Sequence, residues 1–497
     1  MPHAAGAAGR RVTAAGLSTA ERRALAQIDP VALLSDLDTL VTAHSLDGDE
    51  STAQRTAAGF MRTHGLRTHE WQIDLAELHR HPSFSSEVER TEALGLVGEI
   101  GEEAGGRSLM FNAHIDVVPA GDESLWAHDP WRVTVAGGNA YGRGALDDKG
   151  GVVCAMHAAR AIARAGVHLS GRLLIASVIG EEDGGTGTLG TILAGHVADA
   201  AVVVEPTSLA LVPAQAGALN FRVTVDGSAA HGCVRNEGVS AIEKFELLHG
   251  ALLRLEAERN GRVTDPLFAR YAMPIPLNIG TLRAGEWPSS VPERLVFEGR
   301  YGVAVGEDPA TARTELEVAL TAVAETDAWL AEHPPRCEWW GGQFDPASTP
   351  ASVPERLVFE GRYGVAVGED PDAARAELEA ALTAVAETDA WLAEHPPRGE
   401  WWGGQFDPAS TPAGHPIVTT VSQAISDLTE TAPVVEGVTY GADMRLLTNV
   451  AHMPTVLFGP GDVTRAHRPD EFVPVHEMVT ATGALILTAL RFCGVKE

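Results

Sequence analysis

Two stretches of the sequence, SLMFNAHIDVV at residues 108–118 and ALDDKGGVVCAMHAARAIA at residues 145–163, decide the fold class. The first is an apolar run with the character of a strand, and it leads into a histidine and an aspartate. The second is rich in alanine and has the character of a helix. Apolar runs at residues 172–179 and 200–204 flank another helix-like stretch at residues 186–194. Strands that alternate with helices in this way predict an α/β domain with a mixed, largely parallel sheet.

The composition is that of a globular protein with a strongly acidic charge. Of the 497 residues, 45% are hydrophobic and 21% are charged, which excludes a wholly disordered, collagenous or multi-spanning membrane protein. Asp and Glu (67) outnumber Lys and Arg (37), and the net charge of −30 argues against nucleic acid and membranes as partners. The four cysteines lie far apart, and no signal peptide is readable. We therefore expect a cytoplasmic protein without a disulfide framework or a thiolate zinc site.

A change of pattern after Pro213 predicts that a second domain is inserted into the first. We expect a disordered tail at residues 1–18, a main α/β domain formed by residues 19–214 and 414–497, and an α+β insert at residues 215–413. Further predicted elements are helices at residues 30–45, 51–64, 238–256, 309–332, 417–428 and 475–493 and strands at residues 220–226, 276–282, 294–305, 338–344 and 454–458.

The insert contains a tandem duplication of 62 residues. Residues 290–351 recur as residues 352–413, and the two copies differ at five positions. Solenoid repeats have shorter units and more copies. Such near-identity is instead typical of a recent duplication or of a sequence-assembly error, and the sequence alone does not separate the two.

Five segments place histidine or carboxylate side chains where strands are predicted to end. They are NAHID (His114, Asp116), ALDDKGG (Asp147, Asp148), GEEDGG (Glu181, Glu182), VVEPT (Glu205) and RAHRPDEF (His467). Ligands of open α/β sheets bind outside the carboxyl ends of the strands, so we expect these groups to converge. Two imidazoles and several carboxylates without a thiolate suit divalent metals, zinc above all. The set offers about three protein ligands for each of two metals.

Each segment also has a purely structural explanation. His114 alone is typical of a core histidine, Asp147 and Asp148 could cap a helix, and His467 could be a surface residue. Their joint occurrence in this order favours the metal site. The stretch GRGALDDKGG (residues 142–151) is a weak match to a dinucleotide-binding loop. The motifs GxxxxGK[ST] and GxSxG are absent, which argues against a P-loop protein and the usual serine hydrolase.

In the order HID, GRGALDDKGG, GEEDGG, EPT, SAAHG and AHRPDEF, the chain resembles the M20 metallopeptidase family from about residue 30 to the C-terminus. Its stretches LNIGTLRAGEWPSSVPE (residues 277–293) and YGADMRLL (residues 440–447) are most similar to the acetylornithine deacetylase and succinyl-diaminopimelate desuccinylase-like deacylases. The resemblance implies that residues 19–214 and 414–497 form a metal-binding, zinc-peptidase-like catalytic domain. It also implies that the insert at residues 215–413 is a ferredoxin-like domain that acts as lid and mediates a homodimer. It also implies two Zn²⁺ per subunit, with Co²⁺ or Mn²⁺ as substitutes.

Carried over by position, the resemblance implies that His114, Asp147 and Glu205 bind one metal. Asp147 would bridge to a second metal, which Glu182 and His467 hold.

The same resemblance implies catalytic roles for three residues. Asp116 would orient His114 through its other ring nitrogen. Glu181, next to a ligand, would be the general base, and His231 of the SAAHG motif would reach the active site of the partner subunit.

The substrate-binding residues are less constrained. Asn278 matches a lid asparagine of the family. A substrate carboxylate needs a local cation, for which Arg445, Arg300 and Arg362 are candidates, although each could equally form a surface salt bridge.

We therefore expect a dinuclear zinc amidohydrolase that removes an acyl group from an N-acyl amino acid or short peptide. The alternatives within the family are a dipeptidase or carboxypeptidase and a formyl or carbamoyl amidohydrolase. Another is a non-catalytic metal-binding homologue impaired by the duplication in its lid. The chain departs from many relatives at Arg468, after the last histidine, and at Ala442, and both departures bear on substrate choice.

Overall fold

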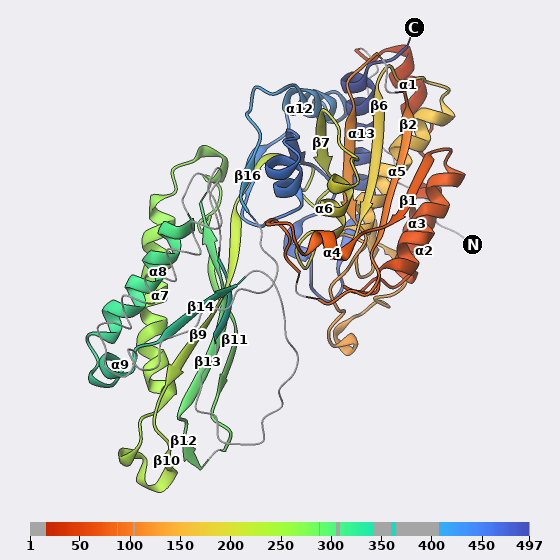
Figure 1. Cartoon of the computed structure of the whole chain (residues 1–497). Coiled ribbons are helices and arrows are strands. Elements are labelled where there is room, and N and C mark those ends of the chain that lie inside the picture. Colours follow the sequence, from red (N-terminus) through yellow and green to blue (C-terminus); the bar gives the residue numbers. More distant parts are fainter. Residues whose placement is uncertain are drawn as a thin grey trace.

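The computed structural model describes residues 16–86, 88–102, 105–287, 289–304, 309–340, 359–363 and 407–496. The described chain forms a large α/β body and a second sheet with its own helices, which lie side by side (Figure 1). In these residues, no helix combines the length and the apolar character that crossing a membrane requires.

The large sheet confirms the predicted mixed, largely parallel architecture. At its centre β3 (Leu109–His114) runs parallel to both β6 (Arg172–Val178) and β7 (Ala200–Val203), and β7 runs parallel to β18 (Thr455–Leu457). Antiparallel strands complete it: β2 (Leu94–Gly101) and β1 (Arg67–Gln72) beyond β6, and β8 (Leu211–Gln215) and β16 (Ala409–Ser410) beyond β18. A further strand, β17 (Val435–Val438), pairs in parallel with β8.

Helices cover this sheet and bury its apolar faces. They are α1 (Thr19–Leu25), α2 (Pro30–Thr42), α3 (Ser51–Thr63), the short α4 (Leu75–Leu78), α5 (Lys149–Arg164), α6 (Thr186–Leu193), α12 (Pro416–Thr429) and α13 (Val475–Cys493). Most side chains of α5 and α13 are buried, as their Ala-rich sequences require for close packing. These two helices pack against each other, which joins the two parts of the chain that the insert separates (Figure 1).

A small three-stranded sheet lies near the ligand-bearing loops. Its strands are β4 (Thr134–Ala136), β5 (Asn139–Tyr141) and β19 (Phe472–Pro474), and β19 pairs with β5. This pairing brings the segment before Asp147 next to the segment after His467.

The second sheet is built mainly from the predicted insert. Its order is β11 (Leu277–Ala284), β13 (Arg294–Val303), β15 (Phe359–Tyr363), β9 (Gly217–Asp226) and β14 (Arg336–Trp340), and β13 also pairs directly with β9 over ten residues. The helices α7 (Ala241–Arg262), α8 (Pro309–Ala324) and α9 (Ala328–Glu332) lie on one side of it (Figure 1). Its core includes Phe221, Leu252, Phe297, Leu316 and Leu320.

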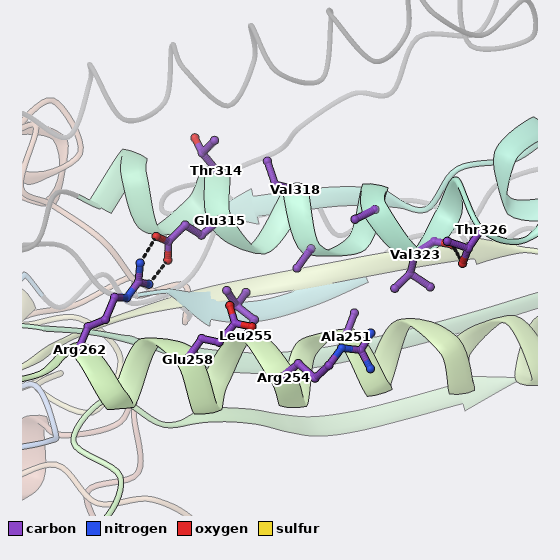
Figure 2. A pocket seen from close by; sticks show the side chains of 12 residues that line it. Ala251, Arg254, Leu255, Glu258, Arg262, Thr314, Glu315, Val318, Val323 and Thr326 are labelled. Carbon is purple, nitrogen blue, oxygen red and sulfur yellow. Dashed lines mark hydrogen bonds and ion pairs between the residues drawn. The ribbon is translucent and has the colours of Figure 1, made fainter.

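A groove of about 750 Å³ lies between α7 and α8 (Figure 2). Its walls include Leu255 of α7 and Val318 of α8, and the ion pair of Arg262 with Glu315 lies at one end of it. None of the predicted site residues lines this groove.

Three sequence expectations differ from the structure in detail. The predicted helix at residues 309–332 is two helices, α8 and α9, because Asp327 accepts hydrogen bonds from the N–H groups of Trp329 and Leu330 and so begins a new helix. The predicted tail is wrong at its end, where Leu17 is buried and Ser18 caps α1; residues 1–15 lie outside the described residues. β16 pairs with β8 in the large sheet a few residues before the expected return at residue 414.

Candidate metal centre

The loops at one edge of the large sheet carry the predicted ligands. His114 is the last residue of β3, Glu205 lies two residues beyond β7, and Glu182 lies in the turn between β6 and α6. His467 lies in the turn between the 3₁₀ helix η5 (Val463–Arg465) and β19. Parallel strands end at the same edge of a sheet, so these positions meet as expected.

Asp147 corrects one element of the prediction. It does not follow a strand of the large sheet, because the nearest preceding strand is β5 of the small sheet. It directly precedes Asp148, which caps α5 by accepting the N–H of Gly151 at 3.1 Å. The capping explanation is therefore right for Asp148, and the start of this buried helix carries Asp147 to the sheet edge.

The structure brings the five predicted ligands together as two groups of three that share Asp147. In the first group, Nε2 of His114 lies 3.0 Å from Oδ1 of Asp147 and 4.0 Å from Oε1 of Glu205. In the second, Nε2 of His467 lies 2.9 Å from Oε1 of Glu182 and 3.5 Å from Oδ2 of Asp147. Within each group the ligand atoms lie within 4.8 Å of one another. Asp147 thus offers a different oxygen to each group, as a bridging carboxylate does.

The electrostatics of the centre fit divalent cations. Burial, together with the neighbouring charge of Asp147, raises the pKa of Glu205 to about 8, and burial also raises the pKa of Asp148 well above its ordinary value. Burial alone would lower the pKa of His467, but Asp147 and Glu182 raise it to about 11. Buried carboxylates in such excess need positive charge beside them. The donor set of imidazole and carboxylate groups suits zinc, cobalt or manganese.

Asp116 contacts His114 in a different way from the simplest expectation. Nδ1 of His114 lies 3.1 Å from the backbone carbonyl of Asp116 and 3.7 Å from its carboxylate Oδ1. The other oxygen of Asp116 accepts the N–H of Glu182 at 3.1 Å. Asp116 therefore connects a ligand of the first group to a ligand of the second.

Glu181 lies near residues of both candidate ligand groups, His114, Glu205 and Glu182, but belongs to neither group. Its side chain is buried, and its Oε1 has no hydrogen-bond partner among the described residues. Burial, with the charge of Glu205, raises the pKa of Glu181 well above its ordinary value. An unengaged carboxylate next to two ligand groups has the placement that a general base requires.

The remaining predicted residues lie elsewhere. His231 is on β10 (Ala230–His231), at the tip of the second sheet away from the large body (Figure 1), where its side chain is exposed. Asn278 of β11 pairs with Arg300 of β13 in the second sheet. The structure does not bring these three residues to the metal-ligand groups within one chain.

Arg445 lies next to the centre and is buried. Its Nη2 donates to the carbonyl of Gly184 at 2.7 Å, in the turn that carries Glu181 and Glu182. Arg362 lies on β15, where it pairs with Arg300.

Sequence reasoning missed the side chains that hold these loops. Arg90 donates to Asp183 at 2.6 Å and to Glu50 at 2.7 Å, which fixes the turn after Glu182. Asp443 accepts a hydrogen bond from Thr188 at 2.5 Å. Asp183 lies within the quoted motif GEEDGG, but no sequence signal connects it to Arg90, which is 93 residues earlier.

A third group of metal-ligating residue types, Asp36, His64 and His157, lies among α2, α3 and α5. Nε2 of His157 and Nε2 of His64 lie 2.9 Å and 3.2 Å from Oδ2 of Asp36. Arg160 donates to Nδ1 of His157 at 3.3 Å, which leaves the ring proton on Nε2. A metal-bound imidazole needs an acceptor at that position instead. This group is a hydrogen-bonded cluster.

Comparison with known proteins identifies the family and the relatives of this chain. The family model "Peptidase family M20/M25/M40" matches residues 110–491. An N-formyl-4-amino-5-aminomethyl-2-methylpyrimidine deformylase of Bacillus subtilis is 26% identical over 408 residues, covering 78% of this chain and 80% of the relative. An acetylornithine deacetylase of Myxococcus xanthus is 26% identical over 448 residues, covering 87% and 95%.

Solved structures share the fold. The dipeptidase Dug1p of Saccharomyces cerevisiae has a TM-score of 0.68 at 12% identity, and the match covers 96% of this chain and 99% of that one. Human carnosine dipeptidase 1 has a TM-score of 0.67 at 13% identity, with the same coverage. The chain therefore belongs to Peptidase family M20/M25/M40, among hydrolases that cleave amide bonds.

Proposed function

We propose that the chain is a two-metal amidohydrolase that removes the acyl group from an N-acyl amino acid or a similar small amide. One observation supports this most directly: two three-residue ligand groups share Asp147, and the unengaged Glu181 lies beside them. The named relatives include a deacetylase and desuccinylases, which agrees with an acyl amide as substrate.

The residues of the chain divide the work of amide hydrolysis. His114, Asp147 and Glu205 would hold one metal, and Asp147, Glu182 and His467 the other. When bound, the metals supply Lewis acidity and lower the pKa of water towards about 7. Glu181 takes the proton of the attacking water and delivers it to the departing nitrogen, a role worth typically 10²–10⁴-fold in rate.

His231 would complete the site from a second subunit. Its imidazole donates a hydrogen bond to the oxyanion of the tetrahedral intermediate, a contribution of roughly 2.7–4 kcal/mol. Its exposed position at the tip of the second sheet, away from the ligand groups of its own chain, supports a role across a homodimer.

A formyl amide is the second candidate substrate. The deformylase relatives of Bacillus subtilis and Halalkalibacterium halodurans, each 26% identical to the chain, favour it. The residues of the metal centre do not distinguish a formyl group from a larger acyl group, because all of them act on the carbonyl and the water.

The test is a substrate screen joined to metal analysis. Purified protein with zinc, cobalt or manganese is assayed on N-acetyl, N-succinyl and N-formyl amines and on dipeptides. We expect two metals per chain and hydrolysis of an acyl or formyl amide. Asp147→Ala should lose both metals, whereas Asp36→Asn, which removes a carboxylate from the hydrogen-bonded cluster, should keep both. Metal binding without hydrolysis of any amide would identify a non-catalytic homologue.

A further inference from the structure

Glu471 lies four residues after His467 and is fully buried. Its Oε1 accepts hydrogen bonds from the backbone N–H groups of Gly144, Leu146 and Asp147, at 2.9, 3.1 and 3.3 Å. One carboxylate oxygen thus collects three donors from the loop that ends in the shared ligand. Buried N–H groups need such an acceptor, because an unsatisfied one costs about 1–3 kcal/mol.

The other oxygen of Glu471 extends the connection to a third loop. It forms an ion pair with Nη1 of Arg143, which is also buried. Nη2 of Arg143 donates to the carbonyl of Pro119 at 3.3 Å, three residues after Asp116. The pair therefore joins the segments of His114, Asp147 and His467, and we call Glu471 and Arg143 the clasp.

The two ligand groups depend on the clasp to different extents. His114 is buried at the end of a central strand and Glu205 lies just beyond another, so the sheet itself positions them. The side chain of His467 is half exposed, on a turn with a φ of +62°. Its segment is tied to the loop of Asp147 by Glu471 and by the pairing of β19 with β5.

We propose that Glu471 is a positioning residue that holds the loop of Asp147 against the turn of His467 and thereby sets the affinity of the second metal group. This inference rests on the metal ligands of the proposed function. Removing the acceptor should weaken the group of Asp147, Glu182 and His467 by roughly 10–100-fold, as is typical of partners behind metal ligands. The group of His114, Asp147 and Glu205 should change little.

The experiment is a titration of metal-free full-length protein with Co²⁺ and Zn²⁺, read by calorimetry and by the visible absorption of Co²⁺. Glu471→Gln keeps the size of the side chain but replaces one acceptor oxygen with an NH₂ donor. That donor would face either the backbone N–H groups or the guanidinium of Arg143, which are donors themselves. Glu471→Asp keeps the charge but shortens the reach, and it serves if the first variant does not fold. Asp470→Asn is the matched control. Asp470 directly precedes Glu471, but its carboxylate accepts the N–H groups of Ala127 and His128 and not those of the Asp147 loop.

We expect Asp470→Asn to bind two metals, each with the affinity that the wild type shows. The Glu471 variants should keep the affinity of one site and bind the other metal more weakly. A folded Glu471 variant with both affinities unchanged would overturn the inference. An equal loss of metal affinity at both sites would show that Glu471 has a general structural role, and it would overturn the inference that Glu471 acts on one site. A wild type that binds no metal would refute the proposed function itself, and the clasp with it.

Discussion

Deleting residues 352–413, the second copy of the duplication, should give a protein at least as stable as the full chain. In the part of the chain that the structure describes, the first copy contributes buried side chains to the core of the second sheet and its helices, among them Leu295, Phe297, Tyr301 and Leu316. The ten-residue ladder between β13 and β9 also lies in the first copy and its partner strand. From the second copy, the structure describes β15 and the residues from Asp407 that return to the large sheet.

The strand register shows why the deletion should join cleanly. β14 and β16 pair antiparallel with β9 and β8, which follow each other directly in the chain, so Trp340 lies opposite Asn220 and Ala409 opposite Gln215. Residues 344–351 have the same sequence as residues 406–413. After the deletion, Ala347 can therefore take the place of Ala409 opposite Gln215. The new connection is two residues longer than a perfect ladder, a mismatch that a bulge absorbs.

The expected change in the free energy of unfolding follows from the entropy of closing the loop. Residues 341–408, 68 in number and including β15, now lie between these two pairings, and six, residues 341–346, would connect them in the variant. The shortening is about three and a half halvings of loop length, and each halving is worth about 0.6 kcal/mol. This loop entropy sets an upper bound of about 2 kcal/mol on the gain in the free energy of unfolding, because the deletion also removes the pairings of β15 with β13 and β9.

The assay is urea denaturation followed by circular dichroism, with metal content and amide hydrolysis measured in parallel. The matched variant deletes residues 290–351 instead and yields the same chain except at the five positions that differ between the copies. Comparing the two deletions separates the loss of a copy from the effect of those five residues. If both shortened chains unfold at lower urea than the full chain, or fold without binding metal, the second copy is required and this reasoning is refuted.

Three further predictions test other parts of the molecule. Glu181→Gln should lower kcat by about 10²–10⁴-fold with metal content unchanged, whereas Glu182→Gln should lose metal; the reverse pattern in elemental analysis would exchange their roles. Mixing His231→Ala with Glu181→Gln subunits should restore some activity by pairing an intact base with an intact histidine, and no recovery after confirmed subunit exchange would exclude a role in trans. Asp36→Ala leaves two imidazole N–H groups without an acceptor and should destabilise the fold by about 1–3 kcal/mol near pH 7. Burial would raise the pKa of Asp36, but hydrogen bonds from both histidines lower it below its ordinary 3.8, so its stabilisation is lost as the pH falls. The difference in melting temperature between wild type and Asp36→Ala should narrow below about pH 4, and a difference that widens there would contradict the cluster.

The sequence alone predicted the large sheet and most of the candidate metal ligands. The alternation of apolar runs with Ala-rich stretches is a local signal, and it predicted β3, α5, β6 and β7 because burial on both faces demands continuous apolar strands. Parallel strands end at one edge, so histidines and carboxylates after them had to meet there. The placement of His114 and Glu205 follows from this rule. Asp147 was expected at the same edge for the wrong reason, since it precedes a helix and follows no strand of that sheet.

Only the tertiary structure decided what positions those side chains and which strands of the two copies the described second sheet contains. Glu471 reaches Gly144 across 327 residues of chain, and no local pattern encodes a contact of that kind. The two copies are nearly identical, so their local propensities and apolar faces are nearly the same. Chain connectivity decides where each copy pairs. The first copy comes soon after β11 in the chain, and its strand β13 pairs with β11 and β9. The end of the second copy forms β16, which pairs with β8. Nearly identical copies are distinguished mainly by their long-range strand pairing, because their position along the chain is the main difference between them.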